Sequence, residues 1–505
     1  MRNASWTTVL LGICSGLVGL ASVTASPVRA LERLRMVFPL LETEIMLDLA
    51  EGTTSHQLVM ANPDLADLAQ AGSSAVTEVL KRALMAPLPH QSIDVVRLSA
   101  GQPLFEQALL AASRLVTLEG QSSPLRGDDL GRAIRAAYRE GQPHLLGVLR
   151  RLPGRSATFN LQTFVAFADR LRRQQGSADR LLAEGQPEPA LEARRARGAA
   201  GPSPWRLRRT VLPVDHRGHP LELVVVEPTA FSNRRIVMIS HGLWDGPESF
   251  LGWAQWLASR GYTALLPVHQ GSDLRQQQAM LMGDQPPPQE DELRLRPLDV
   301  SATLDAVADG RLLAGASLHT DAVAMVGHSW GATTALQVAG LRTTDRKLRH
   351  RCQDGDDPDR NLSWVLQCSW LEAAADRSHG DARVAVAVAV SPPLLLLFDE
   401  SSGPNLTARV LLVSGSRDWL VPPGPEALDP LRRGTPRANG HRLVLASGGG
   451  HFNLRAPADG VQPPVLGPLI EAWINQVLLP EAALRFDRGG WGSDQLPLVD
   501  VTPGL

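Results

Sequence analysis

The stretch AVAMVGHSWGATTAL, residues 322–336, decides the fold that we predict for this chain of 505 residues. An apolar run ends in GHSWG, and a helical pattern begins directly after it. The pattern Gly-x-Ser-x-Gly is weak by itself, because the 44 glycines of this chain make chance matches common. Between a strand and a helix, however, Gly327 and Gly331 allow a sharp turn that exposes the hydroxyl of Ser329 above the sheet edge. This context predicts a nucleophile elbow.

Short β-rich runs recur from Trp205 onward. They are RRTVLPV, LELVVVE, RIVMIS, YTALLPV, AVAMVG, RVAVAVAV, RVLLVSG and HRLVLA. The later runs alternate with helical stretches such as FLGWAQWLASRG, which is typical of a mostly parallel sheet covered on both faces. The first two runs are joined by the turn DHRGHP and can pair antiparallel at one edge. For residues 205–505 we therefore predict an α/β-hydrolase catalytic domain with an eight-stranded, mostly parallel sheet and helices on both faces.

Two later strand ends carry candidates for the partners of Ser329. A serine nucleophile needs a histidine that takes its proton and an acid that holds this histidine, in the chain order Ser, acid, His. The run RVLLVSG leads into Asp418, and HRLVLA leads into His451. Active sites of open α/β sheets form at such strand ends. We predict Ser329, Asp418 and His451 as the catalytic residues, with Asp399 as a weaker candidate for the acid.

The tetrahedral intermediate of acyl transfer needs hydrogen-bond donors for its oxyanion. The backbone N–H of Trp330, the residue after the serine, is one predicted donor. The second comes from the loop after the third strand, which reads SHGL; Gly242 lets this loop turn, and the N–H of Leu243 is the predicted donor. His241 and His328 lie beside these turns, where we expect structural roles.

Residues 31–180 are predicted to form a small all-α domain. The segment LERLRMVFPLLETEIMLDLAEG has apolar residues at steps of three and four, which indicates an amphipathic helix. LFEQALLAASRLV, DDLGRAIRAAYRE and NLQTFVAFADRLRRQ continue the helical pattern without a strand signal. The stretch EGQPEPALEARRARGAAGPSP then indicates a linker, assigned to residues 181–204.

Residues 1–30 are predicted to be a signal peptide. Arg2 precedes an apolar stretch over residues 6–23, and small residues offer cleavage after Ala25 or Ala30. A membrane anchor is the alternative, which the many Gly, Ser and Thr residues and the short span disfavour. We therefore expect an exported protein, either periplasmic or secreted.

Cleavage would remove Cys14 and leave Cys352 and Cys368. An even pair in an oxidising compartment favours a disulfide. Closing this loop would contribute about 3 kcal/mol in the chain-entropy picture. Two buried free thiols are the alternative.

Composition limits the partners. The formal net charge of −2 argues against a nucleic-acid-binding protein. The sequence contains no phosphate loop, nucleotide fingerprint or metal-ligand cluster, so we predict neither a metal nor a cofactor. DGDDPDRN lacks the terminal glutamate of a calcium loop. QQQAMLMGDQPPP fits either a lid over an acyl pocket or a surface loop.

Three segments carry a resemblance to a known family. ISHGLWDGPESFLGWAQWLASRGYTALLPVHQGSD, RPLDVSATLDAV and VAMVGHSWGATTAL together resemble the α/β-hydrolases that include platelet-activating-factor acetylhydrolases and predicted dienelactone hydrolases. The likeness covers residues 205–480, and LLETEIMLDLAEG resembles a domain of unknown function that precedes such hydrolases in some bacteria. The resemblance implies pairing of Cys352 with Cys368 and the roles given above for Ser329, Asp418, His451, Leu243 and Trp330.

Two positions depart from that family. Dienelactone hydrolases use a cysteine nucleophile where this chain has Ser329, which puts that substrate in doubt. The family often has Gly-Gly where this chain has Gly331-Ala332.

These observations predict a serine esterase. The resemblance implies lipid or short-acyl esters as substrates. Such substrates allow peripheral contact with a membrane. The sequence carries no signal for the oligomeric state. A peptidase or amidase on the same triad is one alternative. A non-catalytic hydrolase-fold protein that binds partners through its helical domain is another, which is disfavoured because such proteins usually lose a triad member.

Overall fold

The computed structural model describes residues 31–38, 43–49, 57, 62–63, 78, 82–121, 124–185, 201, 203–355, 357, 359–375, 378–398, 406–433, 440–458, 464–486 and 491–505. The predicted signal peptide, most of the predicted linker and Asp399 lie outside these residues. The chain divides into two compact units. The first comprises residues 1–169 and 277–289, and the second comprises residues 170–276 and 290–505.

A sheet in the first unit corrects the prediction of an all-α domain over residues 31–180. In the described part of this unit, four strands have the order β2-β1-β4-β3. They are β1 (Arg33–Phe38), β2 (Thr43–Asp48), β3 (Val116–Glu119) and β4 (Ser156–Asn160). β1 pairs antiparallel with β2 and parallel with β4, and β3 pairs antiparallel with β4.

The predicted first helix is instead the hairpin β1–β2, because its apolar residues also fit a period of two. Leu47 and Leu49 are buried, whereas Met46 is 41% exposed. Leu34, also buried, lies opposite Leu47 in the ladder. Pro39 lies between the two strands in sequence and disfavours one continuous helix. Alternation between the two faces of a strand therefore explains the pattern better than a helical stripe.

The remaining elements of the first unit are mainly helical. They are α5 (Ser92–Ser99), α6 (Pro103–Ser113), α7 (Gly127–Arg139), α8 (Leu145–Leu149) and the first part of α9 (Leu161–Ala183). Buried side chains from these helices and the sheet form one core, including Val96, Leu109, Ile134 and Ala157. The segment QQQAMLMGDQPPP contains most of α12 (Leu274–Met282), and its residues 277–288 belong to this unit.

The second unit contains a large mixed sheet. Ten strands are present among the described residues, in the order β13-β14-β12-β11-β10-β9-β7-β8-β6-β5. They are β5 (Trp205–Leu212), β6 (Leu221–Pro228), β7 (Arg235–Ser240), β8 (Thr263–Pro267), β9 (His319–His328), β10 (Val384–Val390), β11 (Arg409–Gly415), β12 (Arg442–Ala446), β13 (Trp491–Gly492) and β14 (Pro497–Asp500).

All eight predicted runs form strands in this sheet, but the predicted strand number is wrong. β12, β11, β10, β9, β7 and β8 are mutually parallel. β5 and β6 form the expected antiparallel edge. The two additional strands, β13 and β14, pair antiparallel at the opposite edge. They have only two and four residues, which is too short for a periodic sequence signal.

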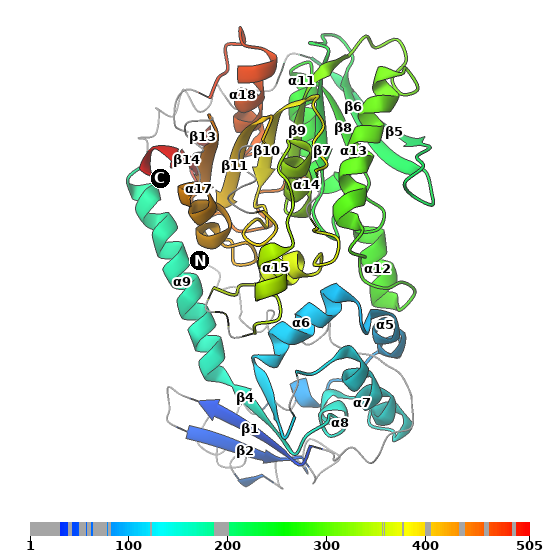
Figure 1. Ribbon diagram of the computed structural model, residues 1–505, viewed down its shortest axis with the longest axis vertical. Coiled ribbons are helices and arrows are strands. Elements are labelled where there is room, and N and C mark those ends of the chain that lie inside the picture. The colour runs from blue at the N-terminus through cyan, green and yellow to red at the C-terminus, as the bar shows by residue number, and fades with distance from the viewer. Residues whose placement is uncertain are drawn as a thin grey trace. The chain divides into compact units, whose positions relative to one another are not determined.

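Helices cover both faces of this sheet. α13 (Glu292–Ala308) and α14 (Trp330–Val338) pack on one face, whereas α11 (Leu251–Ser259) and α18 (Gly467–Leu478) pack on the other (Figure 1). The remaining short helices are η2 (Pro247–Phe250), α15 (Arg346–Arg351), α16 (Ser363–Cys368), η4 (Gly424–Leu428), α17 (Asp429–Arg433) and η5 (Thr502–Gly504).

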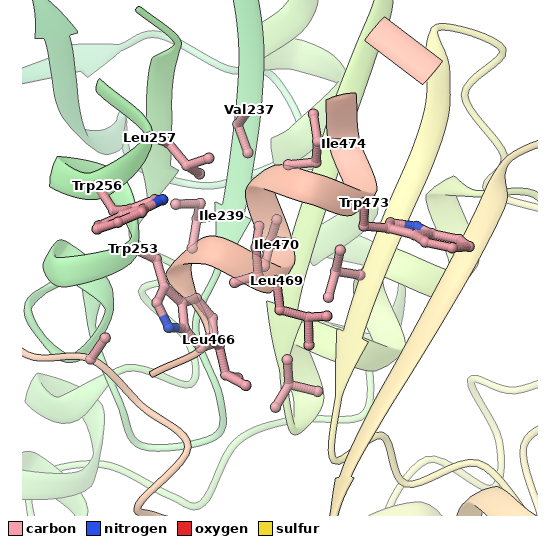
Figure 2. Packing of buried hydrophobic residues seen from close by; sticks show 14 of the residues in the cluster. Val237, Ile239, Trp253, Trp256, Leu257, Leu466, Leu469, Ile470, Trp473 and Ile474 are labelled. Atoms are coloured by element: carbon pink, nitrogen blue, oxygen red, sulfur yellow. The ribbon is translucent and has the colours of Figure 1, made fainter. Parts of the chain in front are cut away.

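The face under α11 and α18 forms the larger core. Figure 2 shows side chains of both helices meeting over β7, among them Trp253, Trp256, Leu469 and Ile470 near Val237 and Ile239, whereas Trp473 of α18 lies over β10 and donates to the carbonyl oxygen of Ala387. Burial of each such side chain contributes about 1.5–3 kcal/mol. This core fixes the parallel strands whose ends carry the candidate site.

The cysteine pairing is confirmed. Cys352, after α15, and Cys368, at the end of α16, form a disulfide with Cα atoms 5.6 Å apart. Across the described ranges, none of the helices is both long and apolar enough to span a membrane.

Candidate active site

The parallel strands end in register at one edge of the sheet. In the ladder, Gly327 of β9 lies opposite Ser240 of β7, and Gly415 of β11 lies opposite Ala446 of β12. The loops that leave this edge carry the predicted site residues Leu243, Ser329, Trp330, Asp418 and His451. The sheet therefore brings together loops that are far apart in sequence.

Ser329 occupies a strained turn between β9 and α14. Its backbone has φ 54° and ψ −120°, a region that non-glycine residues rarely adopt. Its N–H donates to the carbonyl oxygen of Val390 (2.9 Å), and α14 begins at the next residue. Strain of this kind persists only where surrounding contacts enforce it, and it is common at functional sites.

The two glycines of the turn permit close backbone contacts. A Cβ atom on Gly327 would lie 1.9 Å from the carbonyl oxygen of Gly331. A Cβ atom on Gly331 would lie 2.0 Å from the carbonyl oxygen of Ser240. Any larger residue at either position would therefore displace β7 or α14 from the serine.

Asp418 and His451 form a buried hydrogen-bonded pair. Nδ1 of His451 lies 2.8 Å from Oδ2 of Asp418. The other oxygen of Asp418 accepts the N–H groups of Leu420 (3.0 Å) and Val421 (2.8 Å), which fixes the carboxylate plane. A carboxylate accepts only, so Nδ1 of His451 carries the proton donated to Asp418, and Nε2 is the ring nitrogen that can act as a base.

His328 connects the serine turn to the histidine loop. Its Nε2 donates to the carbonyl oxygen of His451 (2.8 Å), and the two rings have centroids 4.7 Å apart. Burial, and secondarily the neighbouring His451, hold the pKa of His328 well below its usual value, so this ring is neutral. The structural role that we expect for His328 is therefore to hold the loop of His451 next to the turn of Ser329.

The hydroxyl of Ser329 makes no hydrogen bond to His451 within the residues that the structure describes. Both side chains are nearly buried, with 4% and 3% of their surface exposed. Hydrogen bonds between a nucleophile and its base are often long without substrate and shorten in the Michaelis complex. The structure thus places Ser329 and His451 at the same edge of the sheet, connected through His328, without a hydrogen bond between them.

Two backbone N–H groups beside Ser329 are available as donors. Among the described residues, neither Leu243 nor Trp330 donates its N–H to a protein acceptor. Trp330 is the first residue of α14, where the N–H has no partner within the helix. A Cβ atom on Gly242 would lie 3.3 Å from Cβ of Ser329, so the loop of Leu243 lies directly against the serine.

A buried cluster of charges that the sequence motifs did not predict contacts this loop through Arg296. Asp299 accepts hydrogen bonds from Nε2 of His216 (2.8 Å), from Nη2 of Arg217 (2.6 Å) and from Nδ1 of His269 (2.7 Å). Glu292 accepts from Nη1 of Arg217 (2.9 Å). We call this group, together with Ser240, Ser272 and Arg296, the buried polar network.

The sequence spacing of three members of the buried polar network could have indicated that they are buried. Glu292, Arg296 and Asp299 recur at steps of four and three, which places them on one face of a helix. Charged residues at the positions where a covered helix should be apolar indicate buried ion pairs. All three belong to α13 and are buried, with 3%, 1% and 0% of their surface exposed.

Burial and pairing set the charges of the network. Burial alone would raise the pKa of Asp299, but hydrogen bonds from His216, His269 and Arg217 outweigh it and lower this pKa. Burial lowers the pKa of His269 to about 4, and that of Arg296 to about 10. At neutral pH the two arginines and two carboxylates therefore balance, and His269 is neutral.

Comparison with known proteins adds no family or relative. A scan against models of protein families gives no match. A search of the curated proteins gives no match either. In the part of the chain that the structure describes, no group of three or more histidine, cysteine or carboxylate side chains is arranged to hold a metal ion.

Proposed function

We propose that this protein is an exported serine hydrolase of the α/β-hydrolase fold that cleaves carboxylic esters. The observation that carries the proposal is the backbone of Ser329, which has a positive φ of 54° on a turn between a parallel strand and a helix. A nucleophile elbow requires this context. The buried pair of Asp418 and His451 at neighbouring strand ends supports the same assignment.

In the acylation step, Nε2 of His451 takes the proton of the Ser329 hydroxyl while its oxygen attacks the ester carbonyl carbon. The carbonyl π electrons move to oxygen, and this oxyanion accepts the N–H groups of Leu243 and Trp330. The intermediate then collapses and expels the alcohol, which receives the proton from His451. Asp418 stabilises the imidazolium that forms between these proton transfers.

Water completes the reaction by the same steps. His451 takes a proton from water, and the hydroxide oxygen attacks the acyl carbon bound to Ser329. The second tetrahedral intermediate uses the same two N–H donors. Its collapse releases the carboxylic acid and returns the proton to the oxygen of Ser329, which regenerates the enzyme.

The substrate class that we propose is a lipid or short-acyl ester, as the resemblance to platelet-activating-factor acetylhydrolases implies. Two exposed aromatic residues support an apolar substrate. Trp419, 41% exposed, follows Asp418, and Phe452, 52% exposed, follows His451. The disulfide between Cys352 and Cys368 supports the proposed export, since such bonds persist in oxidising compartments.

Turnover of p-nitrophenyl esters from acetate to palmitate tests the proposal. The purified protein, the variant Ser329→Ala and the control Ser369→Ala would be compared; Ser369 is a buried serine that donates to the carbonyl oxygen of Leu366. We expect hydrolysis by the wild type and by Ser369→Ala, and none above background by Ser329→Ala. A folded wild-type protein that hydrolyses amides instead would favour a peptidase. Absence of any turnover would favour a binding protein.

A further inference from the structure

The peptide group between Gly242 and Leu243 is fixed by two side chains that contact its carbonyl oxygen. Nη2 of Arg296 donates to the carbonyl oxygen of Gly242 (3.2 Å), and Nδ1 of His241 lies 2.8 Å from the same oxygen. In a trans peptide, the C=O and N–H bonds of one peptide plane point in opposite directions. Groups that fix this carbonyl therefore fix the direction of the Leu243 N–H.

The ring of His241 is a donor in this arrangement. Its Nε2 accepts the backbone N–H of His269 (3.0 Å), so Nε2 carries no proton. Burial, and secondarily the charge of Arg296, hold the pKa of His241 well below its usual value, and the ring is neutral. The proton consequently lies on Nδ1 and is donated to the Gly242 carbonyl.

Arg296 also lies near Trp330, whose N–H is the other proposed oxyanion donor. Its Nη1 donates to the carbonyl oxygen of His241 (2.7 Å). Its guanidinium carbon lies 5.5 Å from the centroid of the Trp330 ring. One side chain therefore contacts the loop of Leu243 and the first residue of α14.

The position of Arg296 is itself determined by buried partners. Nε and Nη2 donate to the hydroxyl of Ser272 at 3.0 and 2.9 Å, and this hydroxyl donates to Glu292 (2.7 Å). The guanidinium is 1% exposed, and Oε2 of Glu292 lies 3.7 Å from its Nε. A buried charge is tolerated only with such pairing, so the side chain has few alternative positions.

We propose that Arg296 is a positioning residue for the oxyanion site: it fixes the Gly242–Leu243 peptide plane so that the Leu243 N–H points at the reacting carbonyl. The inference rests on the proposed function. A cationic donor on the carbonyl oxygen also polarises the peptide, which strengthens the N–H on its other side as a donor.

The test separates oxyanion stabilisation from fold. The variants are Arg296→Met, Arg296→Lys, which keeps the charge but not the planar fork, and the control Arg360→Met. Arg360 is matched to Arg296, because it donates to the carbonyl oxygens of Cys352 (3.2 Å) and Asp354 (3.1 Å) and lies 5.6 Å from the ring centroid of Trp364.

Three quantities are measured for each variant. A fluorophosphonate that labels Ser329 counts the active sites, so that kcat is expressed per labelled site. KM is measured with a p-nitrophenyl ester. The inhibition constant of a trifluoromethyl ketone reports oxyanion stabilisation, because the serine oxygen adds to the ketone carbon, His451 takes the serine proton, and the new alkoxide needs the N–H donors.

Loss of a single oxyanion donor costs about 100- to 1,000-fold in kcat, and loss of its positioning should cost about 10- to 100-fold. For Arg296→Met we expect this fall in kcat per site, a rise of the same factor in the inhibition constant, and a KM within about threefold of the wild type. Arg296→Lys should show a smaller change in the same two quantities, and Arg360→Met should show neither.

Different outcomes overturn different statements. If Arg296 is only structural, its variants will have fewer active sites but an unchanged kcat per site and inhibition constant, and the inference is wrong. The proposed function would still stand in that case if Ser329→Ala is inactive. A folded wild-type protein without ester turnover would overturn the proposed function and this inference together.

Discussion

The second unit contains two Ser–His–Asp sets, and they differ in whether the serine is part of the hydrogen-bond chain. Ser240, His269 and Asp299 form an unbroken chain, with the Ser240 hydroxyl 2.8 Å from Nε2 of His269 and Nδ1 of His269 2.7 Å from Asp299. All three residues are fully buried. Ser240 ends a regular strand, so its hydroxyl serves a neighbouring side chain rather than a substrate.

The set of Ser329, His451 and Asp418 has fewer internal hydrogen bonds, and 4% of Ser329 and 3% of His451 are exposed. Its serine has a positive φ and, among the described residues, a hydroxyl without a hydrogen-bond partner. Its members follow three strand ends at one sheet edge. The comparison teaches that a complete hydrogen-bond chain marks a well-satisfied core, whereas a strained, unpaired serine at a strand end marks a candidate nucleophile.

Exchange of either serine for alanine should give the largest difference between the two sets. Ser329→Ala should lower kcat for ester hydrolysis by at least about 10⁴-fold, because the nucleophile is lost. Ser240→Ala should keep kcat within about tenfold and lower the free energy of unfolding by about 1–3 kcal/mol, because Nε2 of buried His269 loses its donor. Ester kinetics and denaturant unfolding measure both effects. A larger kinetic loss in Ser240→Ala would reverse our assignment of the two sets.

Neutralisation of the two aspartates is the next test. Asp418→Asn should lower kcat by about 10⁴-fold with a small change in stability, because the amide cannot hold the required tautomer of His451. Asp299→Asn should instead destabilise the fold by about 3–5 kcal/mol, because buried Arg217 loses one of its two carboxylate partners and keeps only Glu292. Thermal unfolding and kinetics of the remaining folded protein distinguish these results. Equal kinetic losses in both variants would contradict separate roles.

The pH dependence of the free energy of unfolding should reflect the protonation of His269 in the buried set of Ser240, His269 and Asp299. Burial, and then the charge of Arg296, lower the pKa of His269 to about 4 from an ordinary value near 6.5. As pH falls from about 6.5 to 4, the unfolded chain binds a proton that folded His269 does not, so the free energy of unfolding falls by about 3 kcal/mol from this group.

Replacement of this ring tests the assignment. His269→Gln should lower stability at pH 7 and should reduce the pH slope between 6 and 4.5 by about one proton, as measured by urea unfolding at several pH values. His319→Gln, at the half-exposed start of β9, is the control. An unchanged slope in His269→Gln would mean that folded His269 binds its proton as readily as the unfolded chain does.

The sequence predicted the strands of the second unit because most of them are buried, apolar and bounded by turns. The order of the strands then indicated that Asp418 and His451 would lie near Ser329. In the structure, Asp418 and His451 are joined by a hydrogen bond. The catalytic roles stay predictions. The first unit was mispredicted because apolar spacing in Leu31–Leu49 fits two periods, and only pairing of β1 with the distant β4 resolves the choice.

The buried polar network shows why other features escaped prediction. Arg217 lies in DHRGHP, which as sequence indicates only a hairpin turn. Its partner Asp299 is 82 residues away on α13, and His269 follows β8. The spacing on α13 marks Glu292, Arg296 and Asp299 as buried charges, but it does not identify their distant partners, because the pairing depends on burial that only the complete fold provides.

The smallest expected effect concerns the two aromatic residues next to the set of Ser329, His451 and Asp418. Trp419 and Phe452 follow its acid and its base and keep large exposed surfaces. If they bind the acyl chain, Trp419→Ala and Phe452→Ala should each raise KM for a long-chain p-nitrophenyl ester by about three- to tenfold, since each aromatic face loses about 1 kcal/mol of apolar contact. KM for the acetate should change less, because a short chain does not extend to these two residues.

Phe231 provides the matched control for this prediction. It is 57% exposed, and it lies beside Gly261, whose Cβ would be 2.8 Å from its ring, rather than after a residue of the candidate site. Phe231→Ala should therefore leave KM unchanged for every ester. Equal changes for acetate and for long-chain esters in Trp419→Ala and Phe452→Ala would mean that these two residues support the loops of Asp418 and His451. Their exposure would then say nothing about the substrate, and the set of Ser329 would differ from the set of Ser240 only in its serine turn.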